Sequence, residues 1–211
     1  MSKVPPSTRE ATKLETREAL VRAGATEFAE KGLDAPSLDS ICARAGFTRG
    51  AFYVHFRDRD ELLVAVVDEY LTTFNEAVIA GDDAPEDLEQ TIARYTAAVA
   101  AGAPAVHGWN KWRMHHTLAA CARIPALQAR YVRLHRDAMD RVARAAEAGQ
   151  RAGTVRSDVP ARALAEILVG LTLGVGVMLD VGIPFDLAAD ARGVAKLLTK
   201  PRPRKRGATS G

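Results

Sequence analysis

Residues 48–51 combine a hydroxyl group, a guanidinium group and two very small side chains at the expected start of a helix. The hydroxyl of Thr48 and the first backbone N–H groups of that helix can bind a phosphate. Arg49 can donate two hydrogen bonds to the O6 and N7 atoms of guanine, or contact a phosphate. Gly50 and Ala51 are small enough for the helix backbone to lie close to base edges. These four residues predict contacts with the major groove of DNA.

Two short helices are needed to position these residues. The first runs from Ser37, whose hydroxyl can cap it, to Ala45, and the second runs from Arg49 to Phe56. Three residues join the two helices, and Gly46 is the first of them, where a positive φ is easily tolerated. Two helices joined by a short turn that contains glycine are typical of a helix-turn-helix, whose second helix enters the major groove.

Polar side chains near the end of the second helix extend this prediction. Tyr53 and His55 have polar tips that can donate to phosphate oxygens. The segment 44–59 also holds four arginines against one acid, so its local charge is positive. Capped helices with a glycine turn also occur in all-α proteins that never bind DNA, and in such a protein His55 is a plain exposed histidine. Phe52 and Phe56 share one helix face and are expected in the core.

The composition is that of an ordinary globular protein. The chain has 211 residues, of which 47% are hydrophobic and 26% are charged, so it is neither disordered nor collagen-like, and its length allows one or two domains. The net charge of +3 comes from the last twelve residues, which hold five basic side chains and no acid. The net charge therefore says little about a nucleic-acid partner, and the tail is either a solvated extension or a non-specific DNA arm.

Several classes of protein are excluded. The cysteines, Cys42 and Cys121, lie far apart, so we expect neither a disulfide framework nor a metal site, and a cytoplasmic location. The N-terminus has no apolar signal segment, and the longest uncharged apolar run, 167–179, is shorter than the roughly 20 residues that span a membrane. No nucleophile elbow, phosphate-binding loop or dinucleotide fingerprint is present, so we expect no enzyme and no cofactor.

The hydrophobic pattern is helical nearly throughout and predicts an all-α fold. A flexible N-terminus (1–8), a three-helix helix-turn-helix domain (9–57), a larger helical domain for ligand binding and dimerisation (58–199) and a disordered basic tail (200–211) are expected in that order. The predicted helices beyond the turn region cover 58–80, 85–101, 109–122, 125–152, 160–179 and 186–198.

A candidate ligand site lies in the larger domain. Trp109, Trp112 and His116 fall on one face of a predicted helix, and tryptophan can line a pocket while still offering an N–H group. Tyr95, Met139 and Met178 are candidates to complete the wall. The alternative is that the two tryptophans simply fill the core between helices.

The segments 25–32 (ATEFAEKG) and 37–63, with the core AGFTRGAFYVHF, resemble the N-terminal domain of the TetR family of bacterial repressors over about residues 9–65. The resemblance implies that Arg49, Gly50 and Ala51 face the bases and that Ser37, Tyr53 and His55 bind phosphates. It also implies a DNA role for Thr48 and Arg59. Val54 replaces a common aromatic residue, which affects the expected operator preference.

The resemblance further implies a homodimer that reads a palindromic operator and is released from it by a small-molecule effector. The dimer helices would lie within residues 160–198, where Gly170 and Gly174 allow close approach of two backbones. The alternative is a DNA-binding architectural protein without effector control, which would show weak sequence preference.

Overall fold

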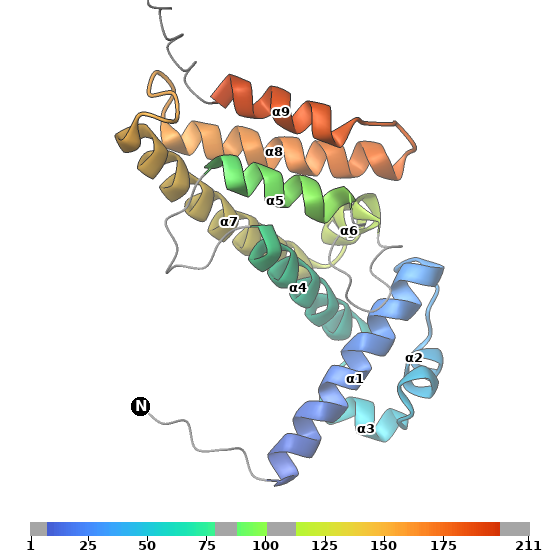
Figure 1. Ribbon diagram of the computed structural model, residues 1–211. Coiled ribbons are helices and arrows are strands. Elements are labelled where there is room, and N and C mark those ends of the chain that lie inside the picture. The colour runs from blue at the N-terminus through green and yellow to red at the C-terminus, as the bar shows by residue number, and fades with distance from the viewer. Residues whose placement is uncertain (1–7, 79–87, 101–112, 199–211) are drawn as a thin grey trace, which may run out of the picture.

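The computed structural model describes residues 8–78, 88–100 and 113–198, and this part of the chain is helical without strands. Two groups of helices are stacked one above the other (Figure 1), with α4 running from the lower group into the upper. The helices are α1 (Thr8–Lys31), α2 (Leu38–Ala45), α3 (Arg49–Tyr53), α4 (Arg59–Val78), α5 (Leu88–Ala100), α6 (Met114–Cys121), α7 (Pro125–Ala152), α8 (Ala161–Asp180) and α9 (Leu187–Leu198). The predicted all-α fold is confirmed.

Helix ends with a clear local signal agree with the sequence analysis. The predicted helix 125–152 is α7, whose C-cap Gly153 has a φ of +75°. The helix α2 begins after Ser37, whose Oγ accepts a hydrogen bond from the backbone N of Ser40 at 3.1 Å.

Other helix ends differ from the prediction. The helix α3 ends at Tyr53 rather than Phe56, because the N–H groups of His55 and Phe56 both donate to the carbonyl of Phe52 and tighten the last turn. Pro160 is the N-cap of α8 rather than its first residue. The described parts of the predicted helices 85–101 and 109–122 are α5 and α6, and Trp109 and Trp112 lie outside the described residues, as does the tail.

The lower group consists of α1, α2, α3 and the first half of α4. Its core is built from fully buried side chains of all four helices, among them Phe28, Ile41, Phe52 and Leu62, each at most 1% exposed. Burial of several large apolar side chains from short helices is what stabilises α2 and α3, which are too short to be stable alone.

The upper group consists of α5 to α9 and the second half of α4. Here α7 packs along α8 and α4, while α5 packs against α4 and α9. A second cluster of buried side chains fills the space, including Val78, Leu88, Ala146 and Leu164. Since α4 contributes side chains to both clusters, it connects the two groups of helices.

The helix α8 is the most apolar element, and much of it is exposed. One 18-residue window has a mean hydropathy of 1.8, apolar enough for a membrane-spanning helix, yet only 22% of it is buried. Ile167, Leu171 and Met178 are 52%, 47% and 44% exposed, and they form one stripe with Gly170 and Gly174, where an added Cβ would meet nothing within 4 Å. An apolar stripe of this kind is typical of a helix that packs against a partner.

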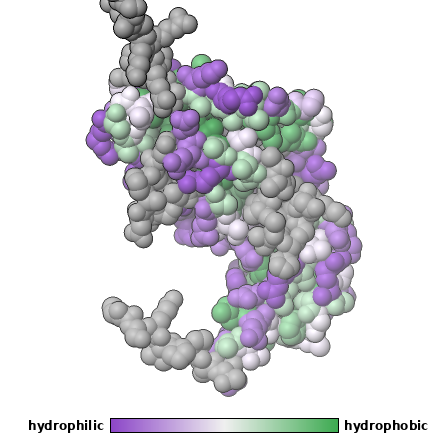
Figure 2. Space-filling model, in the orientation of Figure 1, coloured by the Kyte–Doolittle hydropathy of each residue, from purple (hydrophilic) through white to green (hydrophobic). Residues whose placement is uncertain are grey.

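Large apolar side chains are also exposed beyond α8. In Figure 2, hydrophobic residues reach the surface at the right-hand end of the upper half, where α8 turns into α9. Val181 and Ile183 of that turn are 63% and 45% exposed, and Leu197 of α9 is 69% exposed.

Candidate nucleic-acid interface and small-molecule pocket

The turn between α2 and α3 is closed by hydrogen bonds at both helix ends. Gly46 has a φ of +76°, and its N–H donates to the carbonyl of Ala43 at 3.2 Å, while the N–H of Phe47 donates to that of Cys42 at 2.9 Å. The Oγ1 of Thr48 accepts from the backbone N of Ala51 at 3.2 Å. These caps fix the direction of α3 relative to α2.

The helix α3 has one buried and one exposed face. Phe52 is completely buried, and its ring lies 5.5 Å from that of Phe56, which is 2% exposed. On the opposite face Arg49 and Gly50 are exposed, and Tyr53 is 55% exposed. The residues predicted to contact DNA therefore lie on the solvent side of α3, anchored by the aromatic side.

Other predicted contact residues surround this face. Ser37 is exposed at the start of α2, and Ala51 and His55 are half-buried. Burial, and then the charges of Lys13 and Arg17 in α1, lower the pKa of His55, so its ring is neutral at pH 7. A neutral imidazole can donate one hydrogen bond to a phosphate.

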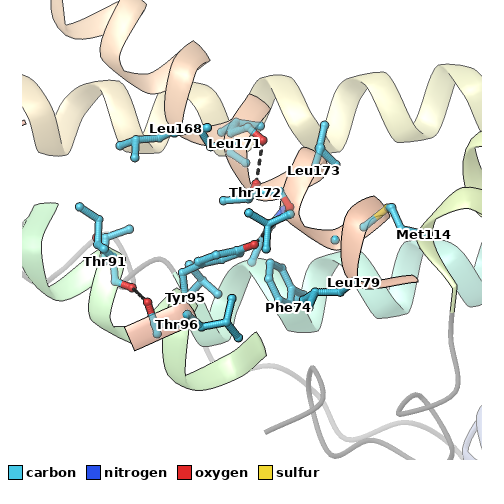
Figure 3. A pocket seen from close by; sticks show the side chains of 18 of the residues that line it. Phe74, Thr91, Tyr95, Thr96, Met114, Leu168, Leu171, Thr172, Leu173 and Leu179 are labelled. Atoms are coloured by element: carbon cyan, nitrogen blue, oxygen red, sulfur yellow. Dashed lines mark hydrogen bonds between the residues drawn. The ribbon is translucent and has the colours of Figure 1, made fainter. Parts of the chain in front are cut away.

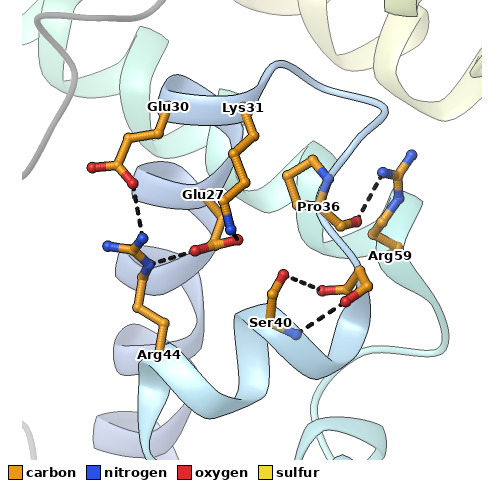
Figure 4. Close-up of polar contacts among 8 residues, drawn as sticks. Glu27, Glu30, Lys31, Pro36, Ser40, Arg44 and Arg59 are labelled. Carbon is orange, nitrogen blue, oxygen red and sulfur yellow. Dashed lines mark hydrogen bonds and ion pairs between the residues drawn. The ribbon is translucent and has the colours of Figure 1, made fainter.

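Arg59 is used differently from the other residues. Its Nη1 donates to the carbonyl of Pro36 at 3.2 Å (Figure 4). Nη1 also donates to the carbonyl of Asp34 at 2.9 Å, and the guanidinium lies 3.9 Å from the carboxylate of that residue. Arg123, just after α6, also binds that carboxylate, at 2.7 Å. Arg59 thus holds the turn that precedes α2, and a contact with DNA remains a prediction.

The positive charge expected in 44–59 is balanced by acids from outside that segment. Each of the four arginines has a carboxylate partner, and the pairs are Arg44 with Glu27 and Glu30, Arg49 with Asp39, Arg57 with Glu61, and Arg59 with Asp34. A count of charges along the sequence misses these partners because they lie in α1, α2, α4 and the turn before α2. The free protein therefore presents a weaker positive patch than the sequence indicates.

Glu27 joins α1 to α2 and is the one acid in this region that is buried. Its side chain is 3% exposed, and its two oxygens accept from Lys31 Nζ and Arg44 Nε, each at 2.6 Å (Figure 4). Burial raises its pKa, but the hydrogen bonds from Lys31 and Arg44 outweigh burial and hold that pKa below the ordinary value of 4.5.

We expect Glu27→Gln to lower the free energy of unfolding at pH 7 by roughly 2 kcal/mol, because two charge-assisted hydrogen bonds are lost while the partners stay hydrated. A carboxylate whose pKa is lowered by folding stabilises above pH 4.5 and loses that effect as the pH falls further. The difference between wild type and variant in urea unfolding should therefore shrink from pH 5 to pH 3. Glu18→Gln, which removes an exposed pair with Arg22, is the control; an equal loss there would contradict the special role of Glu27.

A cavity of about 340 Å³ lies between α4, α5, α7, α8 and α9. Its walls are mainly aliphatic and aromatic, with Phe74, Tyr95, Leu168 and Leu179 among the lining residues (Figure 3). The hydroxyl of Tyr95 donates to the carbonyl of Thr172 at 3.1 Å and ties α5 to α8 across it. Its size and lining are those of a small-molecule site.

The predicted ligand residues are only partly brought together. Tyr95 lines the cavity, whereas His116, Met139 and Met178 do not. The ring of His116 lies about 4.0 Å from the position of a Cβ on Gly32. Trp109 and Trp112 lie outside the described residues.

Sequence reasoning missed the polar groups of the cavity. Asp180, 10% exposed, accepts from the backbone N and Nδ1 of His115 and lies 3.8 Å from Arg113. Burial lowers the pKa of His135, and its Nδ1 lies 2.9 Å from the carbonyl of Tyr131, so this nitrogen carries the proton and Nε2 is an acceptor. Thr172, which lines the cavity, has the only hydroxyl within the apolar run 167–179. It is the one sign in the sequence of a polar group in this cavity.

In sequence and in structure, this chain is similar to bacterial regulatory proteins. The family model "Bacterial regulatory proteins, tetR family" matches residues 20–66, from the middle of α1 through the first half of α4. The repressor KstR2 of Rhodococcus jostii is 30% identical over 159 residues, covering 74% of this chain and 75% of that protein. The TetC protein of transposon Tn10 from Escherichia coli is 40% identical over 65 residues, but the match spans only 33% of its length.

Among solved structures, SmeT in complex with triclosan has a TM-score of 0.71 and 27% sequence identity, covering 88% of this chain and 92% of SmeT. SmeT is described as the repressor of the Stenotrophomonas maltophilia multidrug efflux pump SmeDEF. The similarity extends over both groups of helices and is not confined to the region around the turn.

Proposed function

The chain belongs to the TetR family of bacterial regulatory proteins, and we propose that it is a homodimeric repressor of a palindromic operator, released by a small-molecule effector. Members of this family are DNA-binding transcriptional regulators and not enzymes. The repressor acts in the cytoplasm, where its operator lies. The observation that carries the proposal is the exposed face of α3, on which Arg49, Gly50 and Tyr53 stand clear of the core.

The apolar stripe of α8 supports the homodimer. Large side chains at Ile167 and Leu171 are about half exposed, and the space over Gly170 and Gly174 is open. A second copy of the same stripe is self-complementary to it, as a twofold interface requires. The dimer pairs two copies of α3, and half-sites lie about 34–36 Å apart for such helix-turn-helix dimers.

The cavity in the upper helices supports an apolar effector. Three aromatic side chains, Tyr70, Phe74 and Tyr95, line it, and its one deeply placed acid, Asp180, already has basic partners. SmeT, a structural relative, is found with triclosan. A largely apolar, ring-containing molecule with a hydrogen-bond donor for His135 fits this lining, and it acts as an effector by preferring the form of the dimer that does not bind DNA.

Selection of bound sequences from random double-stranded DNA tests the proposal. A repressor returns a palindrome, with a large ratio of operator to non-operator affinity that persists when salt is raised. An architectural protein returns weak preferences, and its binding is lost steeply with salt. Release of the selected operator in a screen of apolar aromatic compounds tests the effector.

We expect Arg49→Ala to weaken operator binding by roughly 1–3 kcal/mol and to relax one base pair in each half-site. In contrast, Tyr53→Phe removes only a phosphate donor and should weaken binding to all sequences alike. Fluorescence anisotropy with the operator and its single-base variants distinguishes the two. Unchanged operator binding by Arg49→Ala means that the recognition face is assigned wrongly.

A further inference from the structure

The side chain of Arg49 is held by a carboxylate of the neighbouring helix. Asp39 lies in the first turn of α2 and accepts from Nε of Arg49 at 2.5 Å and from Nη2 at 2.7 Å, so the contact is bidentate. Both side chains are exposed, Arg49 at 55% and Asp39 at 70%. An exposed arginine otherwise samples many rotamers, and this contact selects one of them.

The contact leaves the DNA-reading edge of the guanidinium available. Arginine has five N–H donors, and Asp39 occupies one on Nε and one on Nη2. The two N–H groups of Nη1 and the second of Nη2 stay available at the far end of the fork. That end is the one that donates two parallel bonds to O6 and N7 of guanine.

The charge of Asp39 has a second effect. A carboxylate beside the reading helix repels phosphates, so it opposes binding to any DNA, whatever its sequence. Because Asp39 binds Arg49, it also disfavours the rotamers in which Arg49 would contact a phosphate. In those rotamers the side chain would add affinity without contacting a base. Asp39 therefore weakens binding to DNA of any sequence and strengthens the preference for one base.

Resting on the proposed function, we propose that Asp39 is a specificity-determining residue that positions Arg49 to read a guanine in each half-site. Asp39 itself touches no base. Asp39 lies in the first turn of α2, near the positive end of that helix dipole, which is a favourable place for a carboxylate. The other three arginines of this region bind groups outside α3. Arg44 binds α1, Arg59 binds the turn before α2, and Arg57 binds Glu61 of α4.

The test is a comparison of sequence preferences among full-length variants. Wild type, Asp39→Asn, Asp39→Glu and Asp60→Asn are each used to select from the same random DNA library. Asp60 is exposed in the first turn of α4, so Asp60→Asn is a control for the loss of one negative charge. We expect Asp39→Asn to lose about tenfold of its preference for guanine at one base pair, and to bind non-operator DNA about threefold more tightly. The control keeps the wild-type preference, and Asp39→Glu regains part of it.

A double variant separates positioning from a general effect on folding. In an Arg49→Ala background, Asp39→Asn should change no base preference, because the residue through which Asp39 acts is gone. If Asp39→Asn selects the same sequences as wild type, or sharpens the preference for guanine, the inference is overturned while the repressor function stands. If wild type itself selects no palindrome, the proposed function fails and the inference fails with it.

Discussion

Replacing Ile167 with glutamate is expected to produce a monomer that binds its operator at least about 100-fold more weakly. The side chain is the first of the apolar stripe of α8 and is about half exposed, and it does not line the cavity. In the proposed dimer each copy then places a carboxylate against an apolar surface, without a partner and away from water, which costs several kcal/mol. A monomer carries only one α3 and loses the gain from binding two half-sites at once.

The matched control is Val132→Glu, which puts the same charge on an exposed apolar position of α7 outside the stripe. Light scattering should give the mass of one 22.7 kDa chain for Ile167→Glu and of two for wild type and control. Circular dichroism should show that all three are equally helical. A dimeric Ile167→Glu protein with normal operator affinity would place the dimer interface elsewhere.

Phe52→Ala is expected to lower the free energy of unfolding of the lower helices by about 3–5 kcal/mol. Its ring is fully buried against Phe56 and the core of α1, α2 and α4, and it is the main anchor of a five-residue helix. A five-residue helix is not stable by itself, so α3 depends on the burial of this ring. Operator binding should therefore be lost even though the solvent-facing residues of α3 are unchanged.

Two neighbouring substitutions calibrate this result. Phe52→Leu keeps most of the apolar volume and should cost less than half as much, and Tyr53→Phe, on the exposed face, should change stability by under about 0.5 kcal/mol. Urea unfolding followed by far-ultraviolet dichroism gives the three values. Similar values for Phe52→Ala and Tyr53→Phe would contradict the assignment of the two faces.

Features governed by neighbours in the sequence could be predicted from it. The caps at Ser37 and Thr48 and the left-handed turn at Gly46 depend on a few adjacent residues, and the structure has each where expected. The sequence pattern predicts an end of α3 that is three residues too late, because the tight turn after Phe52 depends on burying Phe56, a tertiary contact. Pattern alone does not show where such a contact stops a helix.

Features that depend on how helices are rotated against each other were beyond the sequence. The cavity takes Phe74, His135 and Leu168 from three different helices, and nothing in their spacing along the chain brings them together. The carboxylate partners of the arginines in 44–59 were missed for the same reason. Asp39, ten residues before Arg49, reaches it only because the turn folds α2 back across α3.

The half-exposed stripe of α8 has a consequence for gene dosage. If the reading unit is a pair of chains, then at concentrations below the dimer dissociation constant the amount of that unit grows with the square of the number of chains. Where the operator is far from saturated, halving the expression of the protein then reduces operator occupancy by more than half. The number of protein chains in the cell thus affects transcription from the regulated promoter, as the effector does. The steepness of this response depends on how strongly the two α8 stripes bind each other.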